Sequence, residues 1–213
     1  MNPTPKPGIL EISPYVGGRS SVPGMAKAFK LSSNESALGP SPAALAAMDQ
    51  AKASLSLYPE GSGAMLRQAL ADFHNLDSAR IVTSGDGSDA LLTMLANAYL
   101  RPGDEVVFSQ HAFLVYKIAT LANSAKPVLV PEKNTNQVIK VDVDAMLAAV
   151  TPRTRMVYIA NPNNPTGSYL TREEMARLHA GLPRHVLLVI DAAYSEYVTA
   201  KDYEAGIEMV SAF

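Results

Sequence analysis

The chain has 213 residues, of which 47% are hydrophobic and 18% are charged, and its net charge is −2. This length and composition are typical of a globular protein with a sizeable core, and they exclude a disordered chain. No basic run indicates a nucleic acid or an anionic membrane as a partner, and no apolar run approaches the roughly 20 residues of a membrane helix.

The chain contains no cysteine, which excludes a disulfide framework, a thiolate metal site and a cysteine nucleophile. The proline-rich N-terminus lacks the apolar core of a signal peptide, so we expect a cytoplasmic protein. Four histidines lack the spacing of a metal site, and we therefore expect no bound metal: His74, His111, His179 and His185.

Residues 1–42 are predicted to form an N-terminal arm, because prolines and glycines recur too often there for a long helix. Two helices are predicted next, at 43–55 and 63–74, with Tyr58 and Pro59 in the break between them.

From residue 80 onward, short apolar runs alternate with amphipathic segments. Strands are predicted at 81–84, 105–109, 127–130, 155–159 and 186–190, and helices at 88–100, 113–121, 143–150 and 171–182. Thr171 and Glu174 have the spacing of a capping box at the start of the last helix. The alternation predicts an α/β fold, in which helices cover both faces of a mostly parallel sheet.

The apolar run at 186–190 has no polar alternation, so we interpret it as a strand buried on both faces. Asp191 follows this strand directly, and Tyr194 comes three positions later. Open α/β sheets bind ligands at the carboxyl ends of their strands. Asp191 is therefore a candidate ligand-binding carboxylate, and the alternative is a residue that caps the following turn.

Two loops at predicted strand ends are further candidates. Gly-Asp-Gly-Ser-Asp at 85–89 precedes a helix, whose N-terminal amides favour an anion such as phosphate. The alternative is an ordinary turn with Ser88 or Asp89 as the N-cap. Asn-Pro-Asn-Asn-Pro-Thr-Gly at 161–167 is expected to form a stiff loop that presents side-chain amides at the edge of the sheet. The alternative is a turn without a functional role.

Phe113 and Tyr116 open a predicted helix just beyond a strand. An aromatic side chain at this position stacks on a flat ligand or fills the core, and the residues alone leave both possibilities open.

Taken together, these stretches resemble the fold-type I, pyridoxal-phosphate-dependent aminotransferases, and within that family its histidinol-phosphate branch. The resemblance follows the order of the chain through five motifs, which lie at 31–42, 58–59, 85–89, 161–167 and 191–194. It implies a three-layer large domain at 43–213, preceded by the arm at 1–42.

The resemblance implies pyridoxal 5'-phosphate as cofactor and assigns roles around it. Asp191 would pair with the protonated pyridine nitrogen, and Asn164 and Tyr194 would hydrogen-bond the phenolic oxygen. These three are the expected catalytic residues. Phe113 would stack on the ring, and the turn at Gly87, Ser88 and Asp89 would hold the phosphate.

The resemblance also implies a homodimer with a shared active site. Tyr58 would reach the phosphate of the partner's cofactor, and Asn34 and Glu35 would belong to the substrate side. The implied reaction exchanges an amino group between histidinol phosphate, an imidazole-bearing phosphate ester, and 2-oxoglutarate in histidine biosynthesis. The alternatives are an aromatic or other amino-acid aminotransferase, a phosphothreonine-type decarboxylase, or an inactive cofactor-binding fragment.

The chain departs from the family pattern at several positions. It lacks the Ser/Thr-Phe-Ser-Lys motif, whose lysine attaches the cofactor, and Lys201 has no matching context. The substrate-binding arginine is also missing. Ala192 and Ser36 replace a glutamate and a proline that are common in the family. In the family the strand order is usually 3-2-4-5-6-7-1, and here the last two strands and the small domain are absent. We therefore expect the strand at 186–190 to be an exposed apolar edge.

Overall fold

The computed structural model describes residues 3–14, 21, 23–24, 30–31, 33–36 and 38–210. Contacts divide the chain into two compact units. The smaller unit is Ser13–Ala64, and the larger unit combines Met1–Ile12 with Met65–Phe213. Each unit is described by itself.

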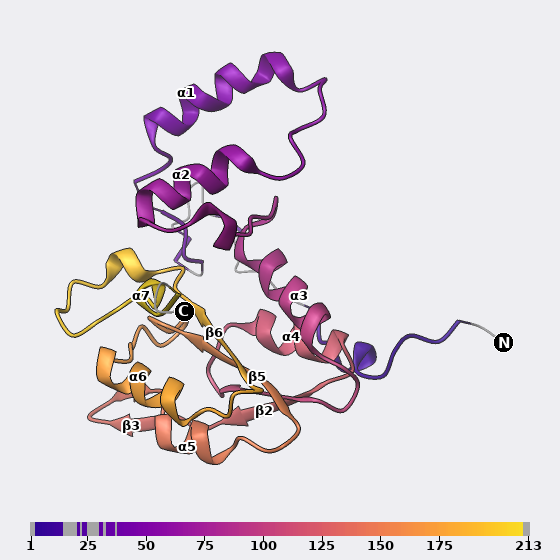
Figure 1. Ribbon diagram of the computed structural model, residues 1–213, viewed down its shortest axis with the longest axis vertical. Coiled ribbons are helices and arrows are strands. Elements are labelled where there is room, and N and C mark those ends of the chain that lie inside the picture. Colours follow the sequence, from indigo (N-terminus) through magenta and orange to yellow (C-terminus); the bar gives the residue numbers. More distant parts are fainter. Residues whose placement is uncertain are drawn as a thin grey trace. The chain divides into compact units, whose positions relative to one another are not determined.

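A parallel four-stranded sheet forms the centre of the larger unit (Figure 1). Its strands are β1 (Glu105–Ser109), β2 (Lys126–Val130), β5 (Thr154–Ala160) and β6 (Leu187–Asp191). They lie in the order β2-β1-β5-β6, and every pair is parallel. In the numbering of the predicted strands this is the order 3-2-4-5, so the predicted α/β class is confirmed.

Helices cover both faces of the sheet (Figure 1). On one face lie α3 (Gly87–Tyr99) and α4 (Leu114–Ala122), and on the other lie α5 (Val143–Ala148) and α6 (Arg172–Gly181). Alternate residues of β1 join different cores: Val106 and Phe108 pack with α3 and α4, while Val107 packs with α5 and α6. Since both faces are covered, the strand must be apolar on both, which explains its lack of polar alternation.

The predicted capping box at the start of α6 is present. The Glu174 amide donates to the Thr171 hydroxyl at 3.2 Å, and the Thr171 amide donates to the Glu174 carboxylate at 2.8 Å. The same carboxylate accepts from Lys140 at 2.6 Å, which ties α6 to the strand β4 (Val138–Lys140).

The predicted strand at 81–84 is wrong. This segment is not a strand in the structure, and Val82 is 66% exposed. A strand needs a neighbour for its backbone hydrogen bonds, and the strand expected beside this segment is not formed by any of the described residues. Sequence reasoning also missed the hairpin of β3 (Lys133–Thr135) and β4, because each strand has only three residues and β3 is polar.

The described start of the arm lies against α4. Ile9–Glu11 form a 3-10 turn, and the Ser124 hydroxyl donates to the Pro7 carbonyl at 2.7 Å. Gly8 approaches the helix so closely that a Cβ there would lie 2.4 Å from the Leu121 carbonyl oxygen. Only glycine fits this approach, and it also adopts the positive φ of 91° found there.

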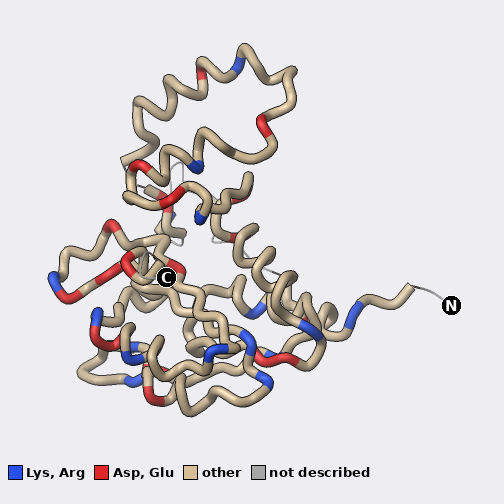
Figure 2. Tube along the Cα trace, in the orientation of Figure 1, with Lys and Arg blue, Asp and Glu red and all other residues tan. Residues whose placement is uncertain are grey.

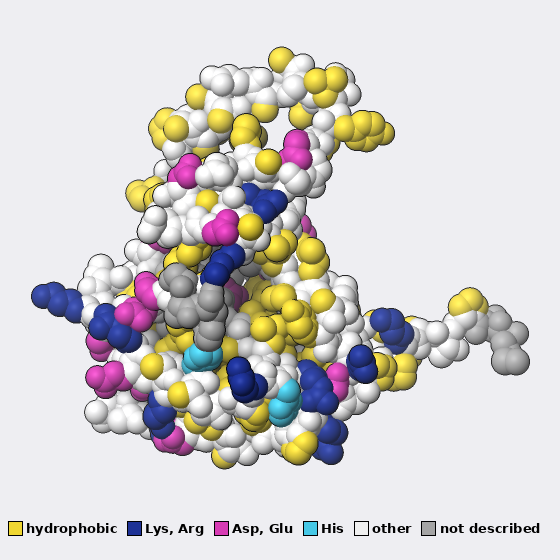
Figure 3. Space-filling view, viewed as in Figure 1, with side chains coloured by type: hydrophobic (Ala, Val, Ile, Leu, Met, Phe, Trp, Pro, Cys, Tyr) yellow, Lys and Arg dark blue, Asp and Glu magenta, His cyan; other side chains and the backbone are white. Residues whose placement is uncertain are grey.

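The smaller unit contains α1 (Pro42–Ala51) and the 3-10 turn Lys52–Ser54. Hydrophobic side chains are exposed along α1 and the segment after it (Figure 3), among them Met48, Leu55 and Leu57. The remaining helices and turns are α2 (Ala64–His74), Ser78–Arg80, Ser195–Tyr197 and α7 (Ile207–Val210).

Positively and negatively charged residues are interspersed along the trace of the larger unit (Figure 2). Among the described residues, no helix is both long enough and apolar enough to cross a bilayer. The same residues contain no cluster of three histidine, aspartate or glutamate side chains that could hold a metal ion.

A buried carboxylate closes the amino end of the sheet. Glu105, which is 2% exposed, accepts from the Thr151 hydroxyl at 2.6 Å and from the Arg153 guanidinium at 2.7 Å. The Thr151 hydrogen bond, followed by that from Arg153, holds the pKa of Glu105 below its usual 4.5. These contacts therefore stabilise the fold more strongly when the carboxyl group is ionised than when it is protonated.

Replacing Glu105 with glutamine is expected to lower the free energy of unfolding by about 1.5–3 kcal/mol at neutral pH, because hydrogen bonds to the charged group are lost. A carboxylate whose pKa is lowered on folding contributes fully above its unfolded-state pKa, and the contribution is lost as the pH falls through its folded-state pKa. The difference between wild type and Glu105→Gln should therefore shrink below pH 4.5. Urea unfolding across this range measures it, with the exposed Glu11→Gln as control. A difference that does not change with pH would contradict the assignment.

Candidate active site

The carboxyl ends of β5 and β6 and the N-terminus of α3 surround a pocket of about 230 Å³. Drug-sized ligands occupy pockets of about 300–1,000 Å³, so this volume fits a ligand with a single ring. Its lining comes entirely from the larger unit: Ser88, Asp89, Phe113, Ala160, Pro162, Asn164, Asp191, Ala193 and Tyr194. The structure thus brings together six residues that the sequence predicts for the site.

Asp191 is the last residue of β6, and its carboxylate is held by two donors. The Tyr116 hydroxyl donates to Oδ2 at 2.8 Å, and the Ala193 amide donates to Oδ1 at 3.2 Å. The bond from Ala193 caps the turn after the strand. The alternative role as a turn cap is therefore correct for Oδ1. Asp191 also lines the pocket, so its carboxylate is available to a ligand.

Tyr116 is fully buried beneath the pocket. Its ring stacks on Tyr158 with centroids 4.5 Å apart and an angle of 5°, and it meets Phe108 and Phe113 edge to face. Burial first, and then the nearby Asp191 carboxylate, raise the pKa of Tyr116 far above its ordinary value of 10. The hydroxyl therefore remains a hydrogen-bond donor to Asp191.

The N-terminus of α3 has the features of an anion site. Its N-cap is Asp86, whose side chain makes no capping bond, so the alternative with Ser88 or Asp89 as N-cap is wrong. Gly87 has φ of 58°, a conformation that favours glycine. The first amides of a helix have no partner within it, so those of Ser88 and Asp89 are positioned for an anion. Asp89 is also among the residues that line the pocket.

The asparagine side chains of the loop at 161–167 hold it in place by hydrogen bonds. Asn161 is fully buried and accepts from the Leu170 amide at 2.8 Å. Asn163, which is 4% exposed, donates to the His111 carbonyl and to the Thr166 hydroxyl, both at 2.8 Å. The Asn161–Pro162 and Asn164–Pro165 peptide bonds are cis. Of the three asparagines, only Asn164 lines the pocket, so the other two shape the loop.

Hydrogen bonds between loops hold Phe113 in place at the start of α4. The Glu132 carboxylate accepts from the His111 amide at 2.6 Å and lies 3.0 Å from Nδ1 of the same residue. Because the His111 carbonyl also bonds Asn163, the loops after β1, β2 and β5 are joined. Phe113, two residues after His111, is thereby fixed as one wall of the pocket.

The remaining predicted residues lie in different surroundings. Tyr194 lines the pocket, and its ring lies 6.3 Å from that of Tyr197. Asn34, Glu35 and Tyr58 belong to the smaller unit, where Glu35 pairs with Lys30 and Tyr58 is fully exposed. Their roles remain predictions.

Sequence reasoning missed the bond between Tyr116 and Asp191. It left Tyr116 as either a ligand-stacking or a core aromatic, and the structure shows a core residue with one polar contact to the site. A usable signal was the spacing from Phe113: three residues along a helix place two side chains on neighbouring parts of one face.

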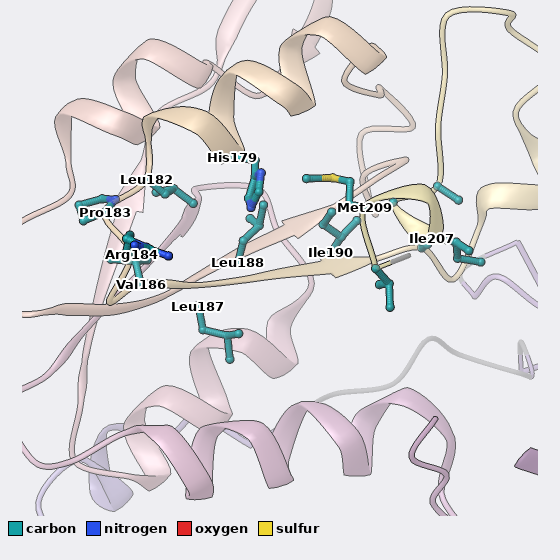
Figure 4. A pocket seen from close by; sticks show the side chains of 14 residues that line it. His179, Leu182, Pro183, Arg184, Val186, Leu187, Leu188, Ile190, Ile207 and Met209 are labelled. Atoms are coloured by element: carbon teal, nitrogen blue, oxygen red, sulfur yellow. The ribbon is translucent and has the colours of Figure 1, made fainter. Parts of the chain in front are cut away.

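A larger pocket of about 660 Å³ lies along β6, between the end of α6 and α7 (Figure 4). In Figure 4 the labelled side chains of Leu188 and Ile190 lie on one side of the strand, near Met209, and Leu187 lies on the other. Its lining is mostly apolar and contains no predicted site residue. We interpret it as the open side of an edge strand, because β6 pairs only with β5 among the described strands.

A sequence model of the class I and II aminotransferases matches residues 26–212. The chain belongs to this family. Pyridoxal 5'-phosphate is the family's cofactor, and the predicted resemblance is confirmed.

Two groups of known proteins are similar to the chain. Histidinol-phosphate aminotransferases of Rhodopseudomonas palustris (strain TIE-1) and Rhodospirillum centenum are 57% and 54% identical over 211 residues. The chain spans 56% and 57% of their lengths, and they match 98% and 99% of it. The crystal structure of histidinol-phosphate aminotransferase from Sinorhizobium meliloti, in complex with pyridoxal-5'-phosphate, matches with a TM-score of 0.72 and 32% identity. The match covers 79% of this chain and 45% of the chain in the crystal structure.

Replacing Asn163 with alanine is expected to lower the free energy of unfolding by about 1–3 kcal/mol, because the buried His111 bond and the Thr166 bond are lost. Asn164→Ala is the matched control, and it should change stability by no more than about 0.5 kcal/mol, since this side chain faces the pocket. Urea unfolding of both variants measures the difference. Equal costs at the two positions would contradict the division of roles within the loop.

Proposed function

We propose that the chain is the cofactor-binding part of a histidinol-phosphate aminotransferase, which exchanges an amino group between histidinol phosphate and 2-oxoglutarate. The observation that carries the proposal is the single pocket shared by Asp191, Asn164, Tyr194, Phe113 and the start of α3. The identity of 57% to a relative named for this activity supports the choice of substrate.

The pocket offers what pyridoxal 5'-phosphate requires. A carboxylate is needed for the protonated ring nitrogen, an anion cradle for the phosphate, and a flat wall for the ring. Asp191, the α3 amides and Phe113 supply these groups from one lining. The residues present therefore fit the cofactor.

When bound, pyridoxal phosphate supplies a cationic ring that takes up the electrons of a substrate carbon that has lost its proton. The residues of this chain hold and orient that ring. Asp191 accepts the N–H of the ring nitrogen, and the amides of Ser88 and Asp89 bind the phosphate. Asn164 and Tyr194 hydrogen-bond the phenolic oxygen. Phe113 stacks on the ring and keeps water from that face.

The proposal needs groups that this pocket does not show. Among the described residues that line it there is no lysine, and Lys201 lies in an exposed turn. We propose that the lysine that attaches the cofactor, and the arginine that binds the substrate carboxylate, belong to the part of the relatives that this chain does not span. We further propose a cytoplasmic homodimer, in which Tyr58 reaches the partner's cofactor and Asn34 and Glu35 contact the substrate.

Pyridoxamine 5'-phosphate is a suitable probe, because it carries an amine and binds without a lysine attachment. Asp191→Asn is expected to weaken its binding about 10–100-fold, since a charge-assisted hydrogen bond is worth about 1.5–3 kcal/mol. Asp89→Asn is the matched control: it removes a negative charge from the same pocket next to the phosphate, so binding should become tighter. Titration of the probe's fluorescence measures both variants. Equal weakening by both would argue against the role of Asp191.

Substrate choice is tested in the protein extended to the length of its relatives. Histidinol phosphate is expected to be the preferred amino donor over phenylalanine when 2-oxoglutarate is the acceptor, and Asp191→Ala should abolish the transfer. Glutamate formation measures turnover. A preference for phenylalanine would favour an aromatic aminotransferase, and carbon dioxide release from a phosphorylated amino acid would favour a decarboxylase.

A further inference from the structure

We propose that Tyr116 is a positioning residue of this site: its hydroxyl fixes the orientation in which the Asp191 carboxylate faces the ring nitrogen of the cofactor. The inference rests on the proposed function, and it adds a residue that does not line the pocket.

The Tyr116 ring has little freedom to move. It is fully buried, with Tyr158 stacked on its face and Phe108 and Phe113 against it edge to face. Protein interiors are close-packed, so a ring enclosed in this way holds its hydroxyl at one place. That place is 2.8 Å from Oδ2 of Asp191.

Asp191 needs such a fixed partner. It is the last residue of β6, an edge strand of the sheet, and it is only partly buried. The terminal torsion of an aspartate side chain is soft, so one hydrogen bond does not define the plane of its carboxylate. The Ala193 bond to Oδ1 is long at 3.2 Å, and the Tyr116 bond to Oδ2 is the shorter of the two. Together the two donors hold both oxygens.

Tyr116 also links two parts of the site. Its ring lies edge to face with Phe113, the predicted stacking residue, at 5.9 Å and 89°. Phe113, the wall for the ligand ring, and the Asp191 carboxylate therefore both contact the same buried side chain, Tyr116. Because the hydroxyl does not ionise in the working pH range, it stays a donor to the carboxylate.

The chain provides a matched control in Tyr158. This residue is 1% exposed and stacked on Tyr116, but its hydroxyl donates to the Leu92 carbonyl at 3.3 Å and does not contact Asp191. Tyr116→Phe and Tyr158→Phe each remove one buried hydroxyl and keep the ring that fills the core. Urea unfolding midpoints show whether both variants retain the fold.

The experiment compares the affinities of two ligands. One is pyridoxamine 5'-phosphate, and the other is its analogue with a CH group in place of the ring nitrogen. Tyr116→Phe is expected to weaken the first about tenfold and to leave the affinity for the second unchanged, because only the first has an N–H for Asp191. Tyr158→Phe should change neither affinity by more than about twofold. In an Asp191→Asn background, Tyr116→Phe should have no further effect.

The outcomes separate this inference from the proposed function. If wild type binds the two ligands equally, the proposed function is overturned together with the inference. If wild type prefers the ring nitrogen and Tyr116→Phe keeps the full preference, only the positioning role is overturned. Equal loss of affinity for both ligands in Tyr116→Phe would assign Tyr116 to packing alone and would also overturn the inference.

Discussion

The candidate site depends on the parallel pairing of β5 with β6, because this pairing places the ends of the two strands side by side. Ala160 is opposite Asp191 in the register, and the Asn161 amide then donates to the Asp191 carbonyl at 2.9 Å. The loop that carries Asn164 therefore starts where β6 ends. A slip of one residue would turn Asp191 to the other face of the sheet, away from Tyr116.

The carboxylates at the two ends of the sheet have different surroundings, and this difference favours a functional role for Asp191. Glu105, at the amino end, is buried, accepts from Thr151 and Arg153, and lies near Lys126. Asp191, at the carboxyl end, has two donors and still lines a pocket. Its oxygens retain lone pairs for a donor from a ligand in the pocket, whereas the Glu105 carboxylate is buried among groups of the fold.

Much of the larger unit could be predicted, because its strands and helices have strong apolar patterns. The segment 81–84 has an apolar pattern too, but it is not a strand. A strand forms only where a second segment lies beside it, and the pattern of one segment does not show this. The motifs predicted six pocket residues. They did not show that Asn164 lines the pocket while the Asn163 side chain donates to the His111 carbonyl. The Tyr116 bond joins residues 75 positions apart, so it follows from tertiary packing and not from local sequence.

The two pockets show that volume alone does not identify the site. The larger one follows β6 because that strand has a neighbour on one side only, and its lining is mostly apolar. In the strand order expected from the family resemblance, β6 has neighbours on both sides, and this lining would belong to the interior of the sheet. The smaller pocket combines a carboxylate, a helix N-terminus and an aromatic wall, which no requirement of sheet packing brings together. The chemistry of its lining, and not its size, therefore makes it the candidate ligand site.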